Sequence, residues 1–143
     1  MKPIALLTTI PSDSHNWNLV FIELFLQEHG FKVINLGPSV PYELLLGACA
    51  QHHPDLLIVS TINGHGYIEG KELIKQVRQI EHMKDKPVFI GGKLSTDANM
   101  SYLYALELEQ AGYTKTYCND EDMEGFATQL SDILKRTAIS RQA

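Results

Sequence analysis

The sequence is poor in the features that mark several common protein classes. It has two cysteines in 143 residues, Cys49 and Cys118, and neither has a second cysteine nearby. This spacing does not match a structural zinc site or a redox dithiol, so both are expected to be reduced thiols. The chain also lacks an apolar run of the roughly 20 residues that a membrane helix needs, and its amino terminus lacks the regions of a signal peptide. We therefore expect a cytoplasmic protein without membrane contact.

Positive charge is scarce as well. Twelve lysines and arginines face 17 aspartates and glutamates, giving a formal net charge of -5, and the basic residues are scattered along the chain. Without a basic stripe for phosphate groups, nucleic-acid binding is not expected. Hydrophobic residues at 44% and charged residues at 20% are typical of a soluble globular protein. The length fits a single domain.

The chain alternates between strand-like and helix-like segments. Short apolar runs typical of strands occur at residues 3–9, 31–36, 55–60, 87–90 and 113–117. Helix-like segments follow them at residues 19–26, 41–53, 68–82, 100–112 and 120–136. We expect a domain of residues 1–136, followed by a disordered, frayed tail of residues 137–143.

This alternation predicts an α/β fold with right-handed crossovers and a parallel sheet covered by helices on both faces. The predicted arrangement is the flavodoxin-like, Rossmann-type doubly wound sheet of five strands in the order 2-1-3-4-5. Ligands of such sheets bind beyond the carboxyl ends of the strands, at the switch point between the first and third strands. Three loops reach that place, at residues 10–18, 60–66 and 91–97.

The first of these loops contains Asp13, Ser14 and His15. Residues two apart in an extended loop point to the same side, so the Asp13 carboxylate is expected to accept a hydrogen bond from a ring nitrogen of His15. Such a carboxylate fixes the tautomer of a metal-binding histidine and raises its basicity. The same pair of residues is also compatible with a simple surface hydrogen bond. No further ligands lie nearby, so His15 would suit a prosthetic group that brings its own equatorial ligands.

The other two loops are open to more than one interpretation. The hydroxyl of Ser60, at the end of a buried strand, needs a partner, which is either a neighbouring backbone group or a ligand nitrogen. Gly91 and Gly92 follow the fourth strand. They permit either the close approach of a ligand or a tight turn with positive backbone angles.

Together, the three loops resemble the cobalamin-binding domains of coenzyme-dependent mutases and methionine synthase. The pattern of that family is D-x-H-x-x-G, then S-x-L, then G-G, and the corresponding residues here are Asp13-x-His15-x-x-Asn18, Ser60-x-Ile62 and Gly91-Gly92. The resemblance is closest to the small subunit of glutamate (methylaspartate) mutase and extends over about residues 4–135. It includes Gly30-Phe31-x-Val33-x-Asn35-x-Gly37 and the Gly64-x-Gly66 loop.

The resemblance implies cobalamin bound base-off and histidine-on, with the dimethylbenzimidazole tail displaced from cobalt into an apolar slot. It implies that His15 is the cobalt ligand, that Asp13 is its hydrogen-bonding partner and that Ser60 meets the buried base. The other residues expected to line the corrin and the nucleotide tail are Ser12, Ser14, Asn16, Asn18, Thr61, Ile62, Gly64, Gly91, Gly92, Lys93, Leu94, Ser95, Thr96 and Asp97.

Asn18 departs from the pattern because it stands where the family has glycine. If that position requires left-handed backbone, asparagine adopts it at a cost relative to glycine. Its side chain is also expected to crowd the corrin face. Ile62 in place of leucine conserves volume.

A radical mutase also needs a chamber for its substrate, usually a barrel of about 250 residues, which this chain cannot contain. The expected function is therefore that of an adenosylcobalamin-binding subunit that acts with a separate barrel-type catalytic subunit and is inactive alone. A corrinoid methyl carrier and a noncatalytic cobalamin sensor remain alternatives. A flavin carrier is disfavoured because the first loop has no glycine. A phospho-receiver is disfavoured because Ser60 stands where its aspartate would be.

Overall fold

The chain folds into a five-stranded parallel sheet with helices on both faces. The structure is a computed structural model that describes residues 2–117 and 123–142. The strands pair in the order β2-β1-β3-β4-β5, and every pairing is parallel. This confirms the predicted fold class and strand order. The strands are β1 (Ile4–Thr8), β2 (Lys32–Asn35), β3 (Leu56–Thr61), β4 (Val88–Gly92) and β5 (Lys115–Tyr117).

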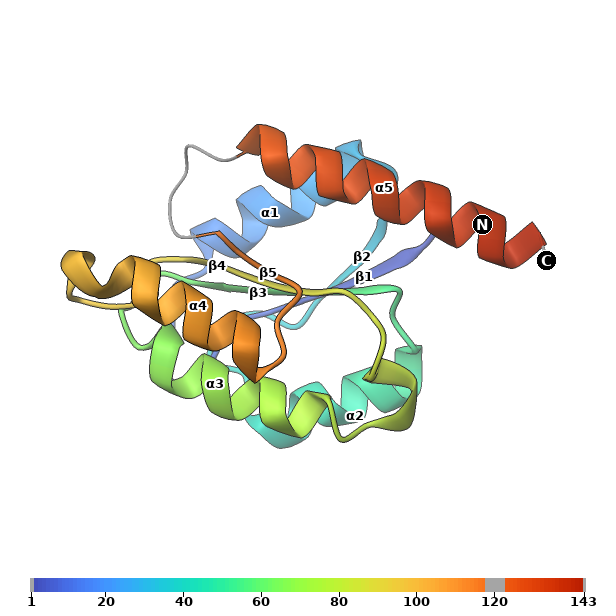
Figure 1. The fold of residues 1–143 in the computed structure, drawn as a ribbon. Coiled ribbons are helices and arrows are strands. Elements are labelled where there is room, and N and C mark those ends of the chain that lie inside the picture. The colour runs from blue at the N-terminus through green and yellow to red at the C-terminus, as the bar shows by residue number, and fades with distance from the viewer. Residues whose placement is uncertain (1, 118–122, 143) are drawn as a thin grey trace.

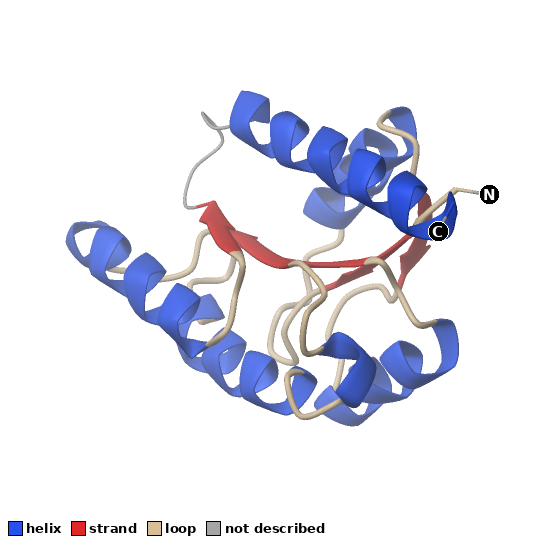
Figure 2. Ribbon diagram, turned by 45° about the vertical axis from the view of Figure 1, so that its right-hand side comes forward, coloured by secondary structure: helices blue, strands red, loops and turns tan. Residues whose placement is uncertain are grey.

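The helices form two layers around the sheet. They are α1 (Trp17–Glu28), α2 (Tyr42–His52), α3 (Gly66–Val77), α4 (Ser101–Ala111) and α5 (Met123–Gln142), with short 3-10 helices η1 (Glu81–Met83) and η2 (Ala98–Met100). Figure 1 shows α1 and α5 on one face of the sheet and α2, α3 and α4 on the other. Figure 2 shows the sheet as one twisted layer between them. None of the helices in the described ranges has the length and apolar character of a membrane-spanning segment.

The central strand β3 shows why the sheet is covered on both sides. All six of its residues are buried. Successive side chains of a strand point to opposite faces, so Leu56 and Ile58 pack with α1 and α5, whereas Leu57 and Val59 pack with the opposite helix layer. The polar residues Ser60 and Thr61 end this strand and lie at the carboxyl edge of the sheet.

Two helices end at positions that differ from the sequence prediction. Helix α5 continues to Gln142, so the segment 137–142, expected to fray, is helical, because no glycine or proline interrupts it. Helix α3 ends at Val77, and η1 follows it. Arg78 donates to the carbonyls of Met83, Lys86 and Gly112, which holds the chain in its reversal after α3.

Of the two cysteines, Cys49 lies in the part of the chain that the structure describes. Cys49 is buried as a free thiol, and burial raises its pKa to about 11, so it stays protonated at neutral pH. Cys118 and the predicted helix start at Asp120 lie outside the described residues.

Candidate functional site

The centre of the carboxyl edge is the buried carboxylate of Asp13, which has no solvent exposure. Its Oδ1 accepts hydrogen bonds from the backbone N–H of His15 at 2.9 Å and from His15 Nδ1 at 2.7 Å. Its Oδ2 accepts from the Thr61 hydroxyl at 2.6 Å and from the Ile62 backbone N–H at 2.9 Å. The hydrogen bond predicted between Asp13 and His15 is therefore confirmed. Thr61, the last residue of β3, and Ile62, which follows it, complete the set of donors.

These contacts favour the ionised form of Asp13 and set the tautomer of a neutral His15 ring. Burial alone raises the pKa of Asp13, but the hydrogen bonds from Thr61, His15 and Ile62 together outweigh it, so the pKa lies below its ordinary value. An ionised carboxylate can only accept, so His15 must donate from Nδ1. The neutral ring then keeps its lone pair on Nε2, the usual state of a metal-binding histidine.

The His15 side chain is accessible from solvent. It is 53% exposed, although the carboxylate behind it is fully buried. Within the described residues, no group of three or more histidine, cysteine, aspartate or glutamate side chains could hold a bare metal ion. His15 therefore offers one well-oriented nitrogen rather than part of an all-protein coordination sphere.

The loop that carries His15 is held at several points. The carbonyl of Asp13 accepts from the Ser39 backbone N–H at 2.7 Å. Glu69, in the first turn of α3, accepts from the Ser12 backbone N–H at 3.0 Å and from the Ser12 hydroxyl. Asn63 donates to the Ser12 hydroxyl oxygen at 2.9 Å. The sequence did not single out Glu69 or Asn63, because nothing local connects Ser12 with a residue 57 positions away.

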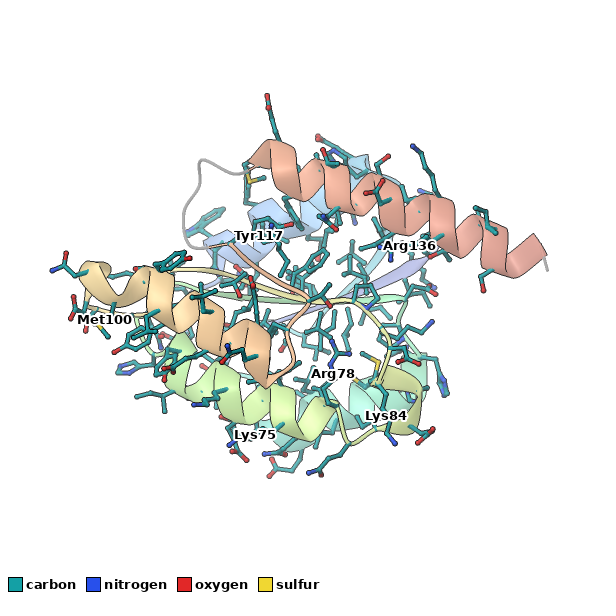
Figure 3. All side chains as sticks on the ribbon, in the orientation of Figure 1. Lys75, Arg78, Lys84, Met100, Tyr117 and Arg136 are labelled. Carbon is teal, nitrogen blue, oxygen red and sulfur yellow. The ribbon has the colours of Figure 1, made fainter. Side chains whose placement is uncertain are left out.

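An apolar cleft opens between the sheet and the helices α1 and α5, next to this loop. Its cavity volume is about 130 Å³. For comparison, an engineered apolar cavity of about 150 Å³ holds benzene. The walls are largely aromatic and aliphatic, and they include Phe21, Ile22, Ile58, Phe89, Tyr117 and Phe126. Figure 3 shows Tyr117 at the end of β5, on the side of the sheet that α5 covers. The cleft suits a flat aromatic group.

Two polar side chains, Asn18 and Ser60, line the same cleft. The Asn18 Nδ2 donates to the Ser60 hydroxyl oxygen at 3.0 Å, and Asn18 Oδ1 is buried without a partner among the described residues. The non-glycine residues with positive φ are Ser39 and His53 in the described part of the chain. The possibility of left-handed backbone at Asn18 is thus wrong, because α1 begins at Trp17 and Asn18 is helical.

Gly91 and Gly92 also line the cleft, and they form the end of β4 rather than a turn after it. Gly92 has a φ of +110°, and a Cβ there would lie 2.0 Å from the Thr61 carbonyl oxygen. Close packing of two strands and a positive backbone angle therefore both require glycine at this position.

The remaining predicted residues lie in different surroundings. Ser14 and Asn16 are exposed in the first loop. Gly64 donates to the Lys93 carbonyl at 3.2 Å, which joins the second and third loops. In the third loop, Ser95, Thr96 and Asp97 are at least partly exposed, but Leu94 is 5% exposed and packs in the core. The Thr61 side chain is also buried and faces Asp13.

Comparison with known proteins identifies the family. A B12 binding domain model matches residues 3–114. The glutamate mutase sigma subunit of Halobacterium salinarum is 27% identical over 115 residues, which cover 80% of this chain and 76% of the relative. Glutamate mutase sigma subunit 1 of Haloarcula marismortui is 24% identical over 142 residues, which cover 99% of this chain and 93% of the relative.

A solved structure shares the fold. The crystal structure of a novel cobalamin-binding protein from Desulfitobacterium hafniense matches with a TM-score of 0.65 at 18% identity, covering 81% of this chain and 52% of that chain. This chain thus spans about half the length of that protein. The family model covers most of the sequence and includes all three loops of the site. The chain therefore belongs to the B12-binding domain family.

Proposed function

We propose that this chain binds adenosylcobalamin for a carbon-skeleton mutase resembling glutamate mutase, and that His15 is the lower ligand of the cobalt. The observation that carries the proposal is the exposed imidazole of His15, bonded through Nδ1 to the buried carboxylate of Asp13. That hydrogen bond leaves Nε2 available to a metal and orients the ring. A single histidine would suffice to hold a cobalt ion that brings its remaining protein-independent ligands with its own corrin ring.

The neighbouring cleft supports the same proposal. Its walls are apolar and its volume suits an aromatic ring, as a displaced lower base requires. Ile62 connects the two parts of the site, because its backbone N–H binds Asp13 while its side chain lines the cleft. We assign the base to this cleft, with the Ser60 hydroxyl available to one of its nitrogens.

The residues around His15 complete the proposed site. The corrin would lie over the loop edge, where Ser12 and Gly64 hold neighbouring loops in place. Exposed or half-buried residues of the first and third loops would contact its rim; they are Ser14, Asn16, Lys93, Ser95, Thr96 and Asp97.

When bound, adenosylcobalamin supplies a cobalt–carbon bond whose homolysis starts radical chemistry. The residues of this chain bind and orient the cofactor, and Asp13 holds a proton on His15 Nδ1. The described residues form an open sheet without a barrel that could enclose a substrate. The relatives are named as sigma subunits of glutamate mutase, which supports a two-component enzyme with a separate barrel-type catalytic subunit.

Electron paramagnetic resonance tests the cobalt ligand. Cob(II)alamin bound to nitrogen-15-labelled protein should show coupling to a protein nitrogen. His15→Ala should abolish this coupling, whereas His65→Ala should retain it, because His65 is an exposed histidine of the second loop. Coupling to the nitrogen of dimethylbenzimidazole, or an unchanged spectrum in His15→Ala, would show that the ligand assignment is wrong.

Reconstitution tests the mutase role. By itself, the chain loaded with adenosylcobalamin should not isomerise glutamate. Addition of a barrel-type mutase subunit, encoded by a gene next to that of this chain, should produce methylaspartate. Isomerisation by the isolated chain would contradict the two-component proposal. A corrinoid methyl carrier would give a different result. It would bind cobalamin through its histidine, show no activity with a mutase subunit, and support methyl transfer when it is mixed with a methyltransferase.

A further inference from the structure

We propose that Asn18 makes the cleft selective for corrinoids whose lower base carries a hydrogen-bond donor, such as the amino group of adenine. The inference rests on the proposed function, since it assigns the base to this cleft. It goes further by naming the chemical class of the base and the residue that recognises it.

The Asn18 amide has two hydrogen-bonding ends in different surroundings. Its Nδ2 donates to the Ser60 hydroxyl oxygen at 3.0 Å, which holds the amide plane between α1 and β3. Its Oδ1 is buried and has no partner among the described residues. Buried side-chain acceptors in folded proteins nearly always have partners, so an unpaired one that lines a cleft indicates a donor on the ligand.

Among the described residues, no side chain of the cleft wall donates to Asn18 Oδ1, and the Tyr117 hydroxyl, which also lines the cleft, does not pair with it. The residues closest to Asn18 along α1 are Phe21 and Ile22, and Phe89 and Phe126 face the cleft from β4 and α5. These side chains have no polar hydrogen. Any group that fills the cleft also excludes water, so a ligand without a donor leaves Asn18 Oδ1 permanently unpaired.

The two kinds of lower base differ in this respect. Dimethylbenzimidazole, once joined to ribose, has an unsubstituted ring nitrogen that accepts a hydrogen bond, and its other edges carry only C–H groups. Adenine has acceptor ring nitrogens and also two amino hydrogens. The Ser60 hydroxyl accepts from Asn18 and can donate its own hydrogen to a ring nitrogen of either base. Only the adenine amino group can pair with Asn18 Oδ1.

The family pattern has glycine at this position, which offers no side-chain acceptor. Asn18 is therefore interpreted as an added contact of this chain rather than as a weakened form of the loop. Selectivity arises because a site that contains an unpaired polar group discriminates against a ligand that cannot satisfy it.

Calorimetric titration with three corrinoids tests the inference. The aquo forms of cobalamin, its adenine-base counterpart, and cobinamide, which lacks the nucleotide, are titrated into wild type, Asn18→Leu and Asn18→Gly. Wild type should bind the adenine form about fivefold to tenfold more tightly than cobalamin, the size of one hydrogen bond. In both variants this ratio should fall to about one, while cobinamide affinity stays unchanged. Gln27→Leu, an exposed change on α1, serves as the control and should keep the wild-type ratio.

The outcomes separate this inference from the proposed function. Three results would overturn the role of Asn18: equal affinities of wild type for the two bases, a preference for dimethylbenzimidazole, or an adenine preference that persists in both variants. If the absorption spectrum still shows His15-dependent binding, the proposed function stands in each of these cases. Failure of all three corrinoids to bind wild type overturns the proposed function as well. Circular dichroism of Asn18→Leu and Asn18→Gly verifies that α1 is retained, and loss of the ratio in the folded variants supports the inference.

Discussion

The Thr61 hydroxyl donates to Asp13 Oδ2 at 2.6 Å and thereby links the end of β3 to the loop that carries His15. Both side chains are fully buried. The orientation of an exposed imidazole therefore depends on a residue that makes no contact with solvent.

Thr61→Val should destabilise the protein by about 1.5–3 kcal/mol, because a buried carboxylate loses a donor while side-chain volume is kept. We also expect weaker cobalamin binding, since Asp13 then holds the His15 ring less firmly. Urea denaturation and cobalamin titration measure the two effects. Thr61→Ser retains the hydroxyl and should lose clearly less binding affinity than Thr61→Val. Equal affinities of the two variants would show that the hydroxyl does not orient His15.

Acid stability should depend on Asp13. Its pKa is lower in the folded protein than the ordinary value of 3.8, so the unfolded chain binds the proton more readily. The resulting stabilisation is present in full above about pH 4 and is lost as the pH falls through the lower folded pKa. The difference in unfolding free energy between wild type and Asp13→Asn should therefore shrink below pH 4. A difference that stays constant from pH 7 to pH 3 would contradict this prediction.

Gly92→Ala should be strongly destabilising, by about 3 kcal/mol or more, because the new Cβ meets the Thr61 carbonyl at 2.0 Å and the φ of +110° is unfavourable for alanine. Gly47→Ala is the matched control. Gly47 lies inside α2, and a Cβ there has no neighbour within 4 Å, so alanine should stabilise by about 0.5–1 kcal/mol. Thermal unfolding compares the two. Similar effects of both changes would mean that strand packing does not require glycine at Gly92.

Glu69→Ala should weaken cobalamin binding about twofold to fivefold, because the Ser12 backbone and hydroxyl lose their common acceptor and the His15 loop gains freedom. Stability should change little, since the contact lies near the surface. Glu72→Ala is the control. It removes another carboxylate of α3, one that accepts a hydrogen bond from Gln76, and it should leave the affinity for cobalamin unchanged. Titration of both variants decides whether the effect is specific to Glu69.

The sequence by itself determined the fold class and the central pair of the site. Regular alternation of apolar runs and helical segments predicted the parallel sheet and its order, because crossover handedness and burial on both faces leave few topologies. The spacing of Asp13 and His15 predicted their hydrogen bond, because it depends only on local backbone geometry. The helix ends were harder to predict, as α5 shows, because no glycine or proline marks where it stops.

Only the tertiary structure decided what surrounds that pair. Thr61 and Ile62 reach Asp13 across 48 and 49 positions of sequence, and Glu69 reaches Ser12 across 57. Such contacts depend on how strands and helices meet at the carboxyl edge, which no local pattern encodes. Asn18 is the clearest case. The sequence indicated only a departure from glycine, whereas the fold places its amide between Ser60 and an apolar cleft and leaves one buried oxygen unpaired.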